Sequence, residues 1–207
     1  MDTAVAKKNG HLPHLAEAPA SDSARDRILF AASELFCRFG INATGVDAIV
    51  DNAGTAKATL YKTFGSKEGL VEAVLQAEGT AWREWFLGEL DKARGSPADK
   101  LVAIFSILER WFAQDRFFGC PFINAVGEND KRDDRYRRIA LAHKSIVMGR
   151  IESLVREAGA EQPGKAAHEL GLLIDGAIVA AMVTGDAKVA RHAKSAARKV
   201  LASFESK

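Results

Sequence analysis

The sequence of 207 residues has little cysteine and no long apolar run, and these two absences exclude several classes of protein. Its two cysteines, Cys37 and Cys120, cannot form a disulfide framework or complete a structural zinc site unaided. We find no run of about 18 apolar residues, which crossing a bilayer requires, and no secretory signal in residues 1–23. The sequence therefore predicts a protein of the reducing cytoplasm that neither spans a membrane nor is exported.

Sequence motifs of common enzyme classes are also missing. The segment Gly65-Ser66-Lys67 lacks the spacing of a phosphate-binding loop, and neither His-Glu-x-x-His nor Gly-x-Ser-x-Gly occurs. The sequence predicts no enzyme activity, no cofactor and no metal site.

Overall charge is almost balanced, with 29 Lys and Arg against 27 Asp and Glu, so the net charge of +2 identifies no partner. Apolar residues make up 47% and charged residues 27%, which is typical of globular proteins. The length suits one sizeable domain or a small head joined to a larger body.

Apolar residues recur at three- and four-residue intervals from Ser23 onward, without strand-like alternation or a fixed repeat. Gly40 is expected to end the first helix, and Ser66 to begin a long fourth one. Residues 1–22 lack such periodicity and are expected to form a mobile tail. The sequence therefore predicts an all-α fold of about nine helices, with a head at 23–70 and a body at 71–207.

Three short helices within the head match a helix-turn-helix, with Gly54 at the sharp turn before the third. Between Ala53 and Lys67 the charged residues are Lys57, Lys62 and Lys67, with no acid among them. Such a basic surface is typical of contact with DNA phosphates, and Tyr61 beside Lys62 also suits a phosphate backbone. On this pattern alone, a structural helical bundle with a solvated face stays an open alternative.

A longer series of residues narrows the choice. It comprises Arg27-Ile-Leu-Phe-Ala-Ala-Ser-Glu-Leu-Phe36, Gly40, Thr44, Ile49, Ala53-Gly54, Thr59-Leu60-Tyr61, Phe64 and Ser66-Lys67-Glu68. This series resembles the amino-terminal domain of tetracycline-repressor (TetR) family regulators over about Ser23 to Leu75. The remainder of the chain agrees with that family only in helical content and length.

The resemblance implies roles for individual residues on double-stranded DNA. Lys57, Ala58, Thr59 and Lys62 would face base edges, and Thr44, Tyr61 and Lys67 would contact phosphates. Lys67 lies in the first turn of a helix, where free N–H groups favour an anion. Capping of the second helix would explain Thr44 equally well.

Two positions depart from the family pattern. Asp47 stands where members often carry a basic residue that contacts bases, and Gly45 replaces a usual Thr or Ser. Asp47 could accept a hydrogen bond from cytosine or simply face solvent. The operator sequence therefore cannot be inferred from the resemblance.

A single head makes few DNA contacts, so we expect a homodimer on a pseudo-palindromic operator, with recognition helices about 34–36 Å apart. The apolar stripes of the last two helices form the expected dimer surface. Its residues are Leu170, Leu173, Ile174, Ala177, Ile178, Ala181, Val189, Ala193, Ala196 and Val200. The alternative is that these stripes form only the core of one chain.

The resemblance also implies a repressor released by a small molecule, whose identity the sequence does not reveal. An apolar or aromatic effector would suit a pocket lined by aromatic residues, although such residues also form cores. The candidates are Trp82, Phe105, Trp111, Phe112, Phe118 and Phe122. A second hypothesis makes Cys120 a redox or electrophile sensor, which requires thiolate character; burial as a small apolar residue is its alternative.

A helical protein-interaction module without DNA binding is the rival from another class. Salt-dependent binding to duplex DNA separates the two hypotheses, because phosphate contacts release counterions.

Overall fold

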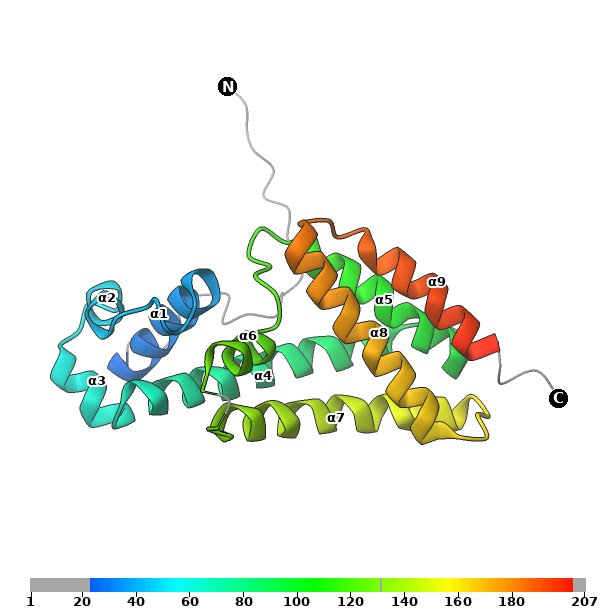
Figure 1. Cartoon of the computed structure of the whole chain (residues 1–207), viewed down its shortest axis with the longest axis horizontal. Coiled ribbons are helices and arrows are strands. Elements are labelled where there is room, and N and C mark those ends of the chain that lie inside the picture. The colour runs from blue at the N-terminus through cyan, green and yellow to red at the C-terminus, as the bar shows by residue number, and fades with distance from the viewer. Residues whose placement is uncertain (1–22, 131, 203–207) are drawn as a thin grey trace, which may run out of the picture.

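The computed structural model describes residues 23–130 and 132–202, and that part of the chain contains nine α-helices and no strand (Figure 1). The helices are α1 (Ala24–Phe39), α2 (Val46–Asn52), α3 (Lys57–Phe64), α4 (Lys67–Lys92), α5 (Pro97–Phe112), α6 (Pro121–Glu128), α7 (Arg135–Glu157), α8 (Pro163–Thr184) and α9 (Val189–Ala202). The predicted all-α fold of about nine helices is confirmed. The tail expected at residues 1–22 lies outside the described residues.

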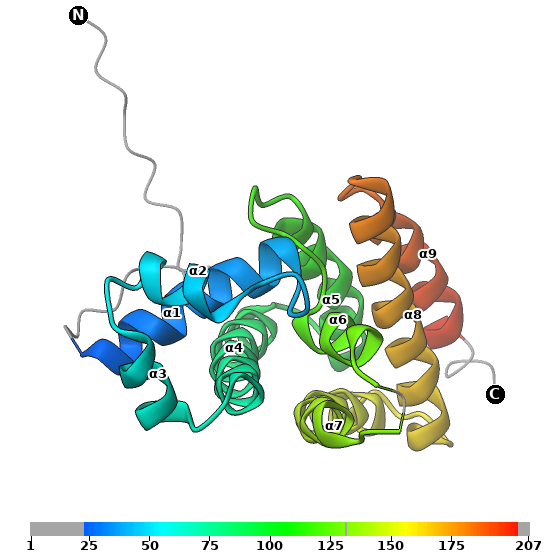
Figure 2. The ribbon, with the colours of Figure 1, turned by 60° about the vertical axis from the view of Figure 1, so that its left-hand side comes forward.

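Helices α1 to α3 form a head at one end of the molecule, and α4 runs from that head into the body (Figure 1). Helix α7 lies alongside α4, while α5, α8 and α9 pack together at the other end. Figure 2 shows α8 and α9 side by side on the side of the body away from α1 to α3.

Short capping motifs fix where these helices begin and end. Helix α1 ends at Gly40, whose φ of 90° favours glycine. Ser66 begins α4, because its side chain accepts a hydrogen bond from the N–H of Gly69 at 3.1 Å. Both positions agree with the sequence prediction.

Two apolar cores lie along α4. One joins α1, α2 and α3 to the first turns of α4, and it also contains Phe122 of α6 and Tyr136 of α7. The other joins the rest of α4 to α5, α7, α8 and α9. The boundary expected near residue 70 falls inside α4, which is unbroken from Lys67 to Lys92. Head and body therefore share α4, and α6 and α7 also bridge them.

The stripe predicted as a dimer surface on α8 lies mostly inside the chain's own core. Leu170, Ile174, Ala177, Ile178 and Ala181 are all buried there. The prediction that these five residues form a dimer contact is wrong, and the single-chain alternative describes them. The other predicted residues are half-buried, namely Leu173, Val189, Ala193, Ala196 and Val200. The period of an apolar stripe shows that one face of a helix is covered. It does not show whether the same chain or a second chain covers that face.

Helix α8 is long and apolar enough, by length and composition alone, to cross a membrane. Its buried residues pack into the core with α5, α7 and α9. This apolar character is that of a core helix.

Candidate functional site

The turn between α2 and α3 depends on Gly54, whose φ is 58°. The N–H of Thr55 donates to the carbonyl of Val50 at 3.0 Å, and the N–H of Gly54 donates to that of Asp51 at 3.2 Å. This pair of bonds is a Schellman motif, which ends a helix where glycine adopts a left-handed conformation. Arg27 of α1 donates to the carbonyl of Ala53 at 3.1 Å. The angle between α2 and α3 is thus held by backbone bonds and by α1.

Helix α3 has one buried and one exposed face. Leu60 is fully buried in the head core, whereas Lys57, Ala58, Tyr61 and Lys62 are exposed. Thr59, also expected to face base edges, is half-buried. Tyr61, at 43% exposed, places its ring and hydroxyl at the surface of the head.

Lys57 is not free of acids, contrary to the sequence argument. Its Nζ lies 2.9 Å from Oδ1 of Asp47 on α2. The hydrogen bond and the charge of Asp47 raise the pKa of Lys57. Lys62, in contrast, forms no ion pair with any residue that the structure describes. The positive face of α3 is therefore centred on Lys62, with Lys57 partly neutralised.

Thr44 does not have the surroundings that the sequence predicted. The residue that precedes α2 as its cap is Gly45, and no side chain caps that helix, so the capping prediction is wrong. Thr44 is only 4% exposed, and its hydroxyl donates to the carbonyl of Gly40 at 2.7 Å. This bond ties the α1–α2 loop to the end of α1, so the buried hydroxyl does not face a DNA phosphate.

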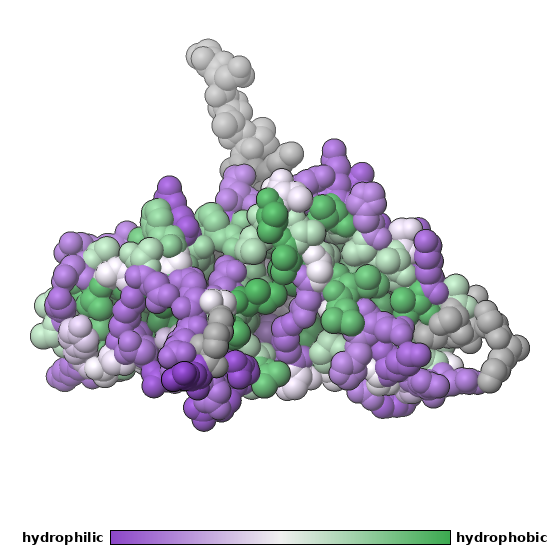
Figure 3. All heavy atoms as spheres, in the orientation of Figure 1, coloured by the Kyte–Doolittle hydropathy of each residue, from purple (hydrophilic) through white to green (hydrophobic). Residues whose placement is uncertain are grey.

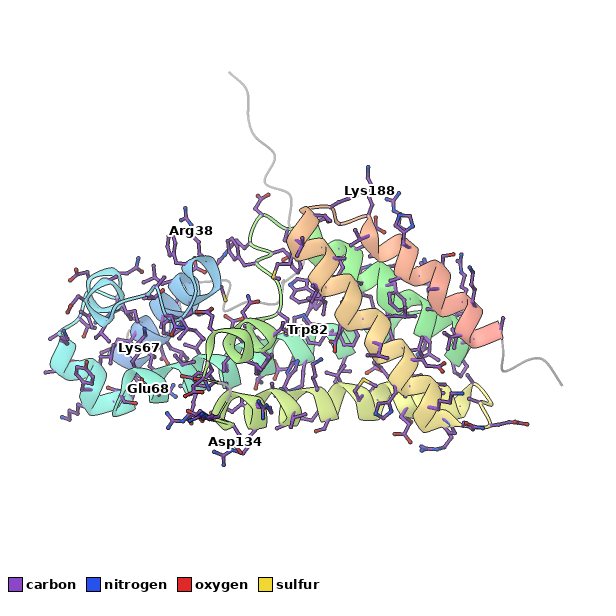
Figure 4. The ribbon with its side chains drawn as sticks, in the orientation of Figure 1. Arg38, Lys67, Glu68, Trp82, Asp134 and Lys188 are labelled. Atoms are coloured by element: carbon purple, nitrogen blue, oxygen red, sulfur yellow. The ribbon has the colours of Figure 1, made fainter. Side chains whose placement is uncertain are left out.

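Lys67 opens α4, as predicted, and Glu68 follows it (Figure 4). Hydrogen bonds from the backbone N–H of Glu68 and from Ser66 lower the pKa of Glu68, so this carboxylate is charged at neutral pH. The first turn of α4 thus carries one cation and one anion beside the helix N-terminus.

A mostly apolar cavity of about 210 Å³ lies in the body. Trp82 of α4 lies near the middle of the molecule (Figure 4). The lining residues are Glu78, Trp82, Trp111, Cys120, Pro121, Phe122, His143, Lys144, Val147, Met148, Ile151, His168, Gly171, Leu172, Ile174, Asp175 and Ile178. They come from α4 to α8, so five helices contribute to one cavity.

Half of the predicted pocket aromatics lie where the sequence placed them. Trp82, Trp111 and Phe122 line the cavity. Phe105 and Phe112 instead pack in the body core, and Phe118 is half-buried away from the cavity wall. Those three predictions are wrong, because a helix that borders a cavity turns only part of its apolar face toward it.

The cavity also has polar residues that the sequence did not predict. The Glu78 carboxylate is 2% exposed and accepts a hydrogen bond from the Ser33 hydroxyl of α1. Lys144 forms an ion pair with Asp175 of α8. These partners lie 45 and 31 residues apart, so no local spacing could have indicated them.

His143 is a further polar group of the cavity that the sequence did not predict. Its ring stacks on Phe122, with the centroids 4.1 Å apart, and Nη1 of Arg83 lies 3.0 Å from its Nδ1. Burial, followed by the charges of Arg83 and Lys144, lowers the pKa of His143 to about 4. The imidazole is therefore neutral at physiological pH.

Cys120 lines the cavity but lacks the surroundings of a reactive thiolate. Burial raises the pKa of its thiol, and the opposing effects of two backbone N–H groups and Lys144 are smaller. Arg116, which could have lowered this pKa, forms an ion pair with Glu34. Burial also raises the pKa of Cys37, to about 12. Both thiols are thus protonated at neutral pH, which does not favour the redox hypothesis.

Two family models match the chain. One, "Bacterial regulatory proteins, tetR family", matches residues 28–74, and "Tetracyclin repressor-like, C-terminal domain" matches residues 97–197. The chain belongs to the TetR family. It is therefore a ligand-responsive, DNA-binding transcriptional regulator and not an enzyme, as predicted, and the interaction module without DNA binding is set aside.

Individual TetR-family relatives agree with this assignment. A helix-turn-helix regulator from the lacX 3′ region of Lactococcus lactis is 27% identical over 169 residues, which cover 80% of this chain and 86% of that protein. The transcriptional repressor KstR2 of Mycolicibacterium smegmatis is 39% identical over 87 residues, or 40% of each chain. The crystal structure of a TetR-family regulator from Streptomyces coelicolor superposes with a TM-score of 0.80 at 26% identity, covering 87% of this chain and 95% of that one.

Proposed function

We propose that this TetR-family protein is a cytoplasmic repressor that binds a pseudo-palindromic operator as a homodimer and is released by a small apolar effector. The observation that carries this proposal is the exposed face of α3, held at a fixed angle by the Gly54 turn. A helix in this position of a helix-turn-helix enters the major groove.

The DNA contacts proposed for the head follow the exposure of its side chains. Lys62, Lys57 and Ala58 would face base edges, because all three are exposed on α3. Half-buried Thr59 would reach a base only at the edge of this surface. Tyr61 and Lys67 would contact phosphates, and Lys67 would do so beside the free N–H groups that begin α4.

The dimer contact that we propose lies on the outer face of α8, opposite to the stripe predicted from sequence. Leu172 is 73% exposed and Val183 is 74% exposed, with Val179 between them at 39%. Gly176, also exposed, lies on the same face and would let a second helix approach closely. Figure 3 shows hydrophobic atoms at the surface along α8, between hydrophilic regions. Because no described part of the chain covers this face of α8, a second copy of the chain is the occupant that suits a two-headed regulator.

Helix α6 offers a direct route from the effector cavity to the head. Phe122, in its first turn, both lines the cavity and packs in the head core. Glu128, its last residue, accepts a hydrogen bond from the loop after α1. Glu78 gives a second route, because it lines the cavity and holds Ser33 of α1. An effector that fits the cavity better when these contacts are shifted would disfavour the DNA-binding arrangement.

Genomic fragments retained by the purified protein, once sequenced, would test the proposal. We expect enrichment of a pseudo-palindrome whose affinity falls steeply with salt and is reduced by Lys62→Ala. Glu152→Ala is a suitable control, because Glu152 pairs only with a neighbouring arginine on the surface of α7. Retention without a common sequence, or binding that Lys62→Ala leaves unchanged, would contradict the proposal.

A further inference from the structure

Two buried hydrogen-bond donors in the cavity wall have no acceptor. The indole Nε1 atoms of Trp82 and Trp111 are both buried and without a hydrogen-bond partner within the described part of the chain. Both residues line the cavity, and Trp111 is only 2% exposed. Buried N–H groups are nearly always paired in folded proteins, so two unpaired donors at one cavity require an explanation.

His143 adds a third donor to the same wall. Arg83 can only donate, so Nδ1 of His143 must accept, and the neutral ring then carries its proton on Nε2. The bond through Nδ1 is the only hydrogen bond that His143 makes with the described residues. The ring is 9% exposed and lines the cavity, which leaves the Nε2–H group for an acceptor from outside the described residues.

The charged groups of the cavity, in contrast, already have partners. Glu78 accepts from Ser33, and Asp175 and Lys144 neutralise each other. The wall therefore combines unpaired N–H donors with one ion pair and the Glu78 carboxylate, which a hydroxyl group binds. A neutral ligand that brings an acceptor would complete this arrangement, whereas an anionic ligand would lie beside the charge of Glu78.

We propose that the effector is a neutral, mostly apolar ring compound whose single acceptor oxygen, as in a ketone, ester or lactone, is bound by His143 Nε2–H and the neighbouring indole N–H groups. This inference rests on the proposed function and specifies its effector class. The cavity of about 210 Å³ exceeds the roughly 150 Å³ that holds benzene in an engineered apolar cavity, so one substituted ring suits its size.

The stacking of the aromatic rings argues against a cationic effector. Cations bind to the faces of aromatic rings. One face of Trp82 is covered by Phe86, with ring centroids 4.6 Å apart, and one face of Phe122 is covered by His143. Trp82 and Phe122 thus each have at most one ring face left for a cation.

Calorimetric titration of the full chain with three probes tests this inference. Acetophenone carries a ketone oxygen, α-methylstyrene has a CH₂ group in its place, and phenyltrimethylammonium is a cation of similar size. We expect acetophenone to bind about tenfold more tightly than α-methylstyrene, since an unpaired buried donor gains its partner. The cation should bind more weakly than the ketone.

Variants then identify the donor. His143→Phe keeps an aromatic ring against Phe122 but removes the N–H group, and it should bring the ketone-to-alkene affinity ratio close to one. His143→Gln restores a donor and should recover part of the ratio. Trp111→Phe removes one indole N–H group and should also lower the affinity ratio. This variant tests the inference if the His143 variants do not fold. Trp85→Phe is the matched control, because Trp85 packs on the same core without lining the cavity.

Several results would overturn the inference. They are equal affinity for ketone and alkene, an unchanged ratio in both His143→Phe and Trp111→Phe, preference for the cation, and no binding of any probe. Duplex binding is measured separately on the same preparations. Loss of duplex binding would contradict the proposed function, whereas retained duplex binding with a negative probe result would contradict only the effector class.

Discussion

The backbone N–H of Asn42 in the α1–α2 loop donates to Oε2 of Glu128, the last residue of α6, over 2.9 Å. The side-chain amide of Asn42 also donates to the Glu128 carbonyl at 2.9 Å. Helix α6 is only eight residues long, and its first turn contains Phe122 of the cavity wall. Under the proposed function, a short helix with one end at the cavity and the other bound to the head would carry a displacement between them.

Replacement of Glu128 by alanine should therefore weaken the coupling between effector and DNA. We expect the affinity for the effector to stay within about twofold. The factor by which the effector lowers operator affinity, which is roughly 5–150-fold in typical allosteric proteins, should fall at least threefold. Operator titrations with and without saturating effector measure this factor. Glu152→Ala, far from the head, should leave it unchanged; an equal effect of both variants would remove α6 from the route.

The ion pair between Asp47 and Lys57 should limit DNA affinity. Asp47→Asn removes an acid from the DNA-facing side and frees Lys57, so duplex affinity at low salt should rise about threefold to tenfold, and the gain should shrink as salt is added. Asp51→Asn is the matched control on α2, since Asp51 forms no ion pair with the described residues. Fluorescence anisotropy with labelled duplex compares the two. An equal gain from both variants would show that net charge matters and the pair does not.

Sequence patterns predicted the helices well because each depends on local chemistry. The stripes of α1 and α5 follow the helical period, and Gly40 and Ser66 mark ends through their own backbone and side-chain geometry. The exposed positions of α3 follow from the same period once Leu60 is placed inward. Local pattern and family motif together thus predicted the fold and most of the exposed positions of α3.

The same patterns failed where the partner of a residue is distant in sequence. The stripe of α8 predicts a covered face, but only the fold shows that α5, α7 and α9 cover it. The pair formed by Lys144 and Asp175, and the stacking of His143 on Phe122, likewise depend on how α6, α7 and α8 meet. Burial against a distant helix leaves no local signal, so most of the cavity residues were assigned only from the structure.

The outer face of α8 leads to a prediction about assembly. Leu172→Glu should convert the protein to a monomer at micromolar concentration, because a carboxylate buried within an apolar helix contact loses its hydration. Leu141→Glu is the control, since Leu141 is 60% exposed on α7, away from this face. Sedimentation equilibrium distinguishes the two. A wild-type monomer, or a dimer that survives Leu172→Glu, would contradict the proposed contact.

The protonated state of Cys120 predicts slow thiol chemistry. With its pKa raised by burial, Cys120 should react with a disulfide reagent at pH 7.5 at least tenfold more slowly than after unfolding, since only the thiolate attacks. Labelling followed by mass spectrometry of the two cysteine peptides measures both rates. Fast labelling of the folded protein at Cys120, or loss of a peroxide response in Cys120→Ser, would revive the redox hypothesis.

His143 predicts how stability depends on pH. Its pKa is lowered to about 4 in the folded chain, whereas an exposed histidine in the unfolded chain has a pKa of about 6.5, so between these values the unfolded state binds the extra proton. Stability from this group is therefore complete above pH 6.5 and is lost as the pH falls toward 4. The expected loss between pH 7.5 and pH 5 is about 2 kcal/mol.

Urea unfolding at several pH values, compared between the wild type and His143→Gln, isolates this contribution from that of the carboxylates. The variant has no imidazole to protonate, so its free energy of unfolding should fall by about 2 kcal/mol less between pH 7.5 and pH 5. His168→Gln, at an exposed position of the same cavity, should keep the wild-type loss. Parallel curves for the wild type and His143→Gln would mean that the pKa of His143 is the same in the folded and unfolded chains, which would contradict its assignment as a buried neutral ring.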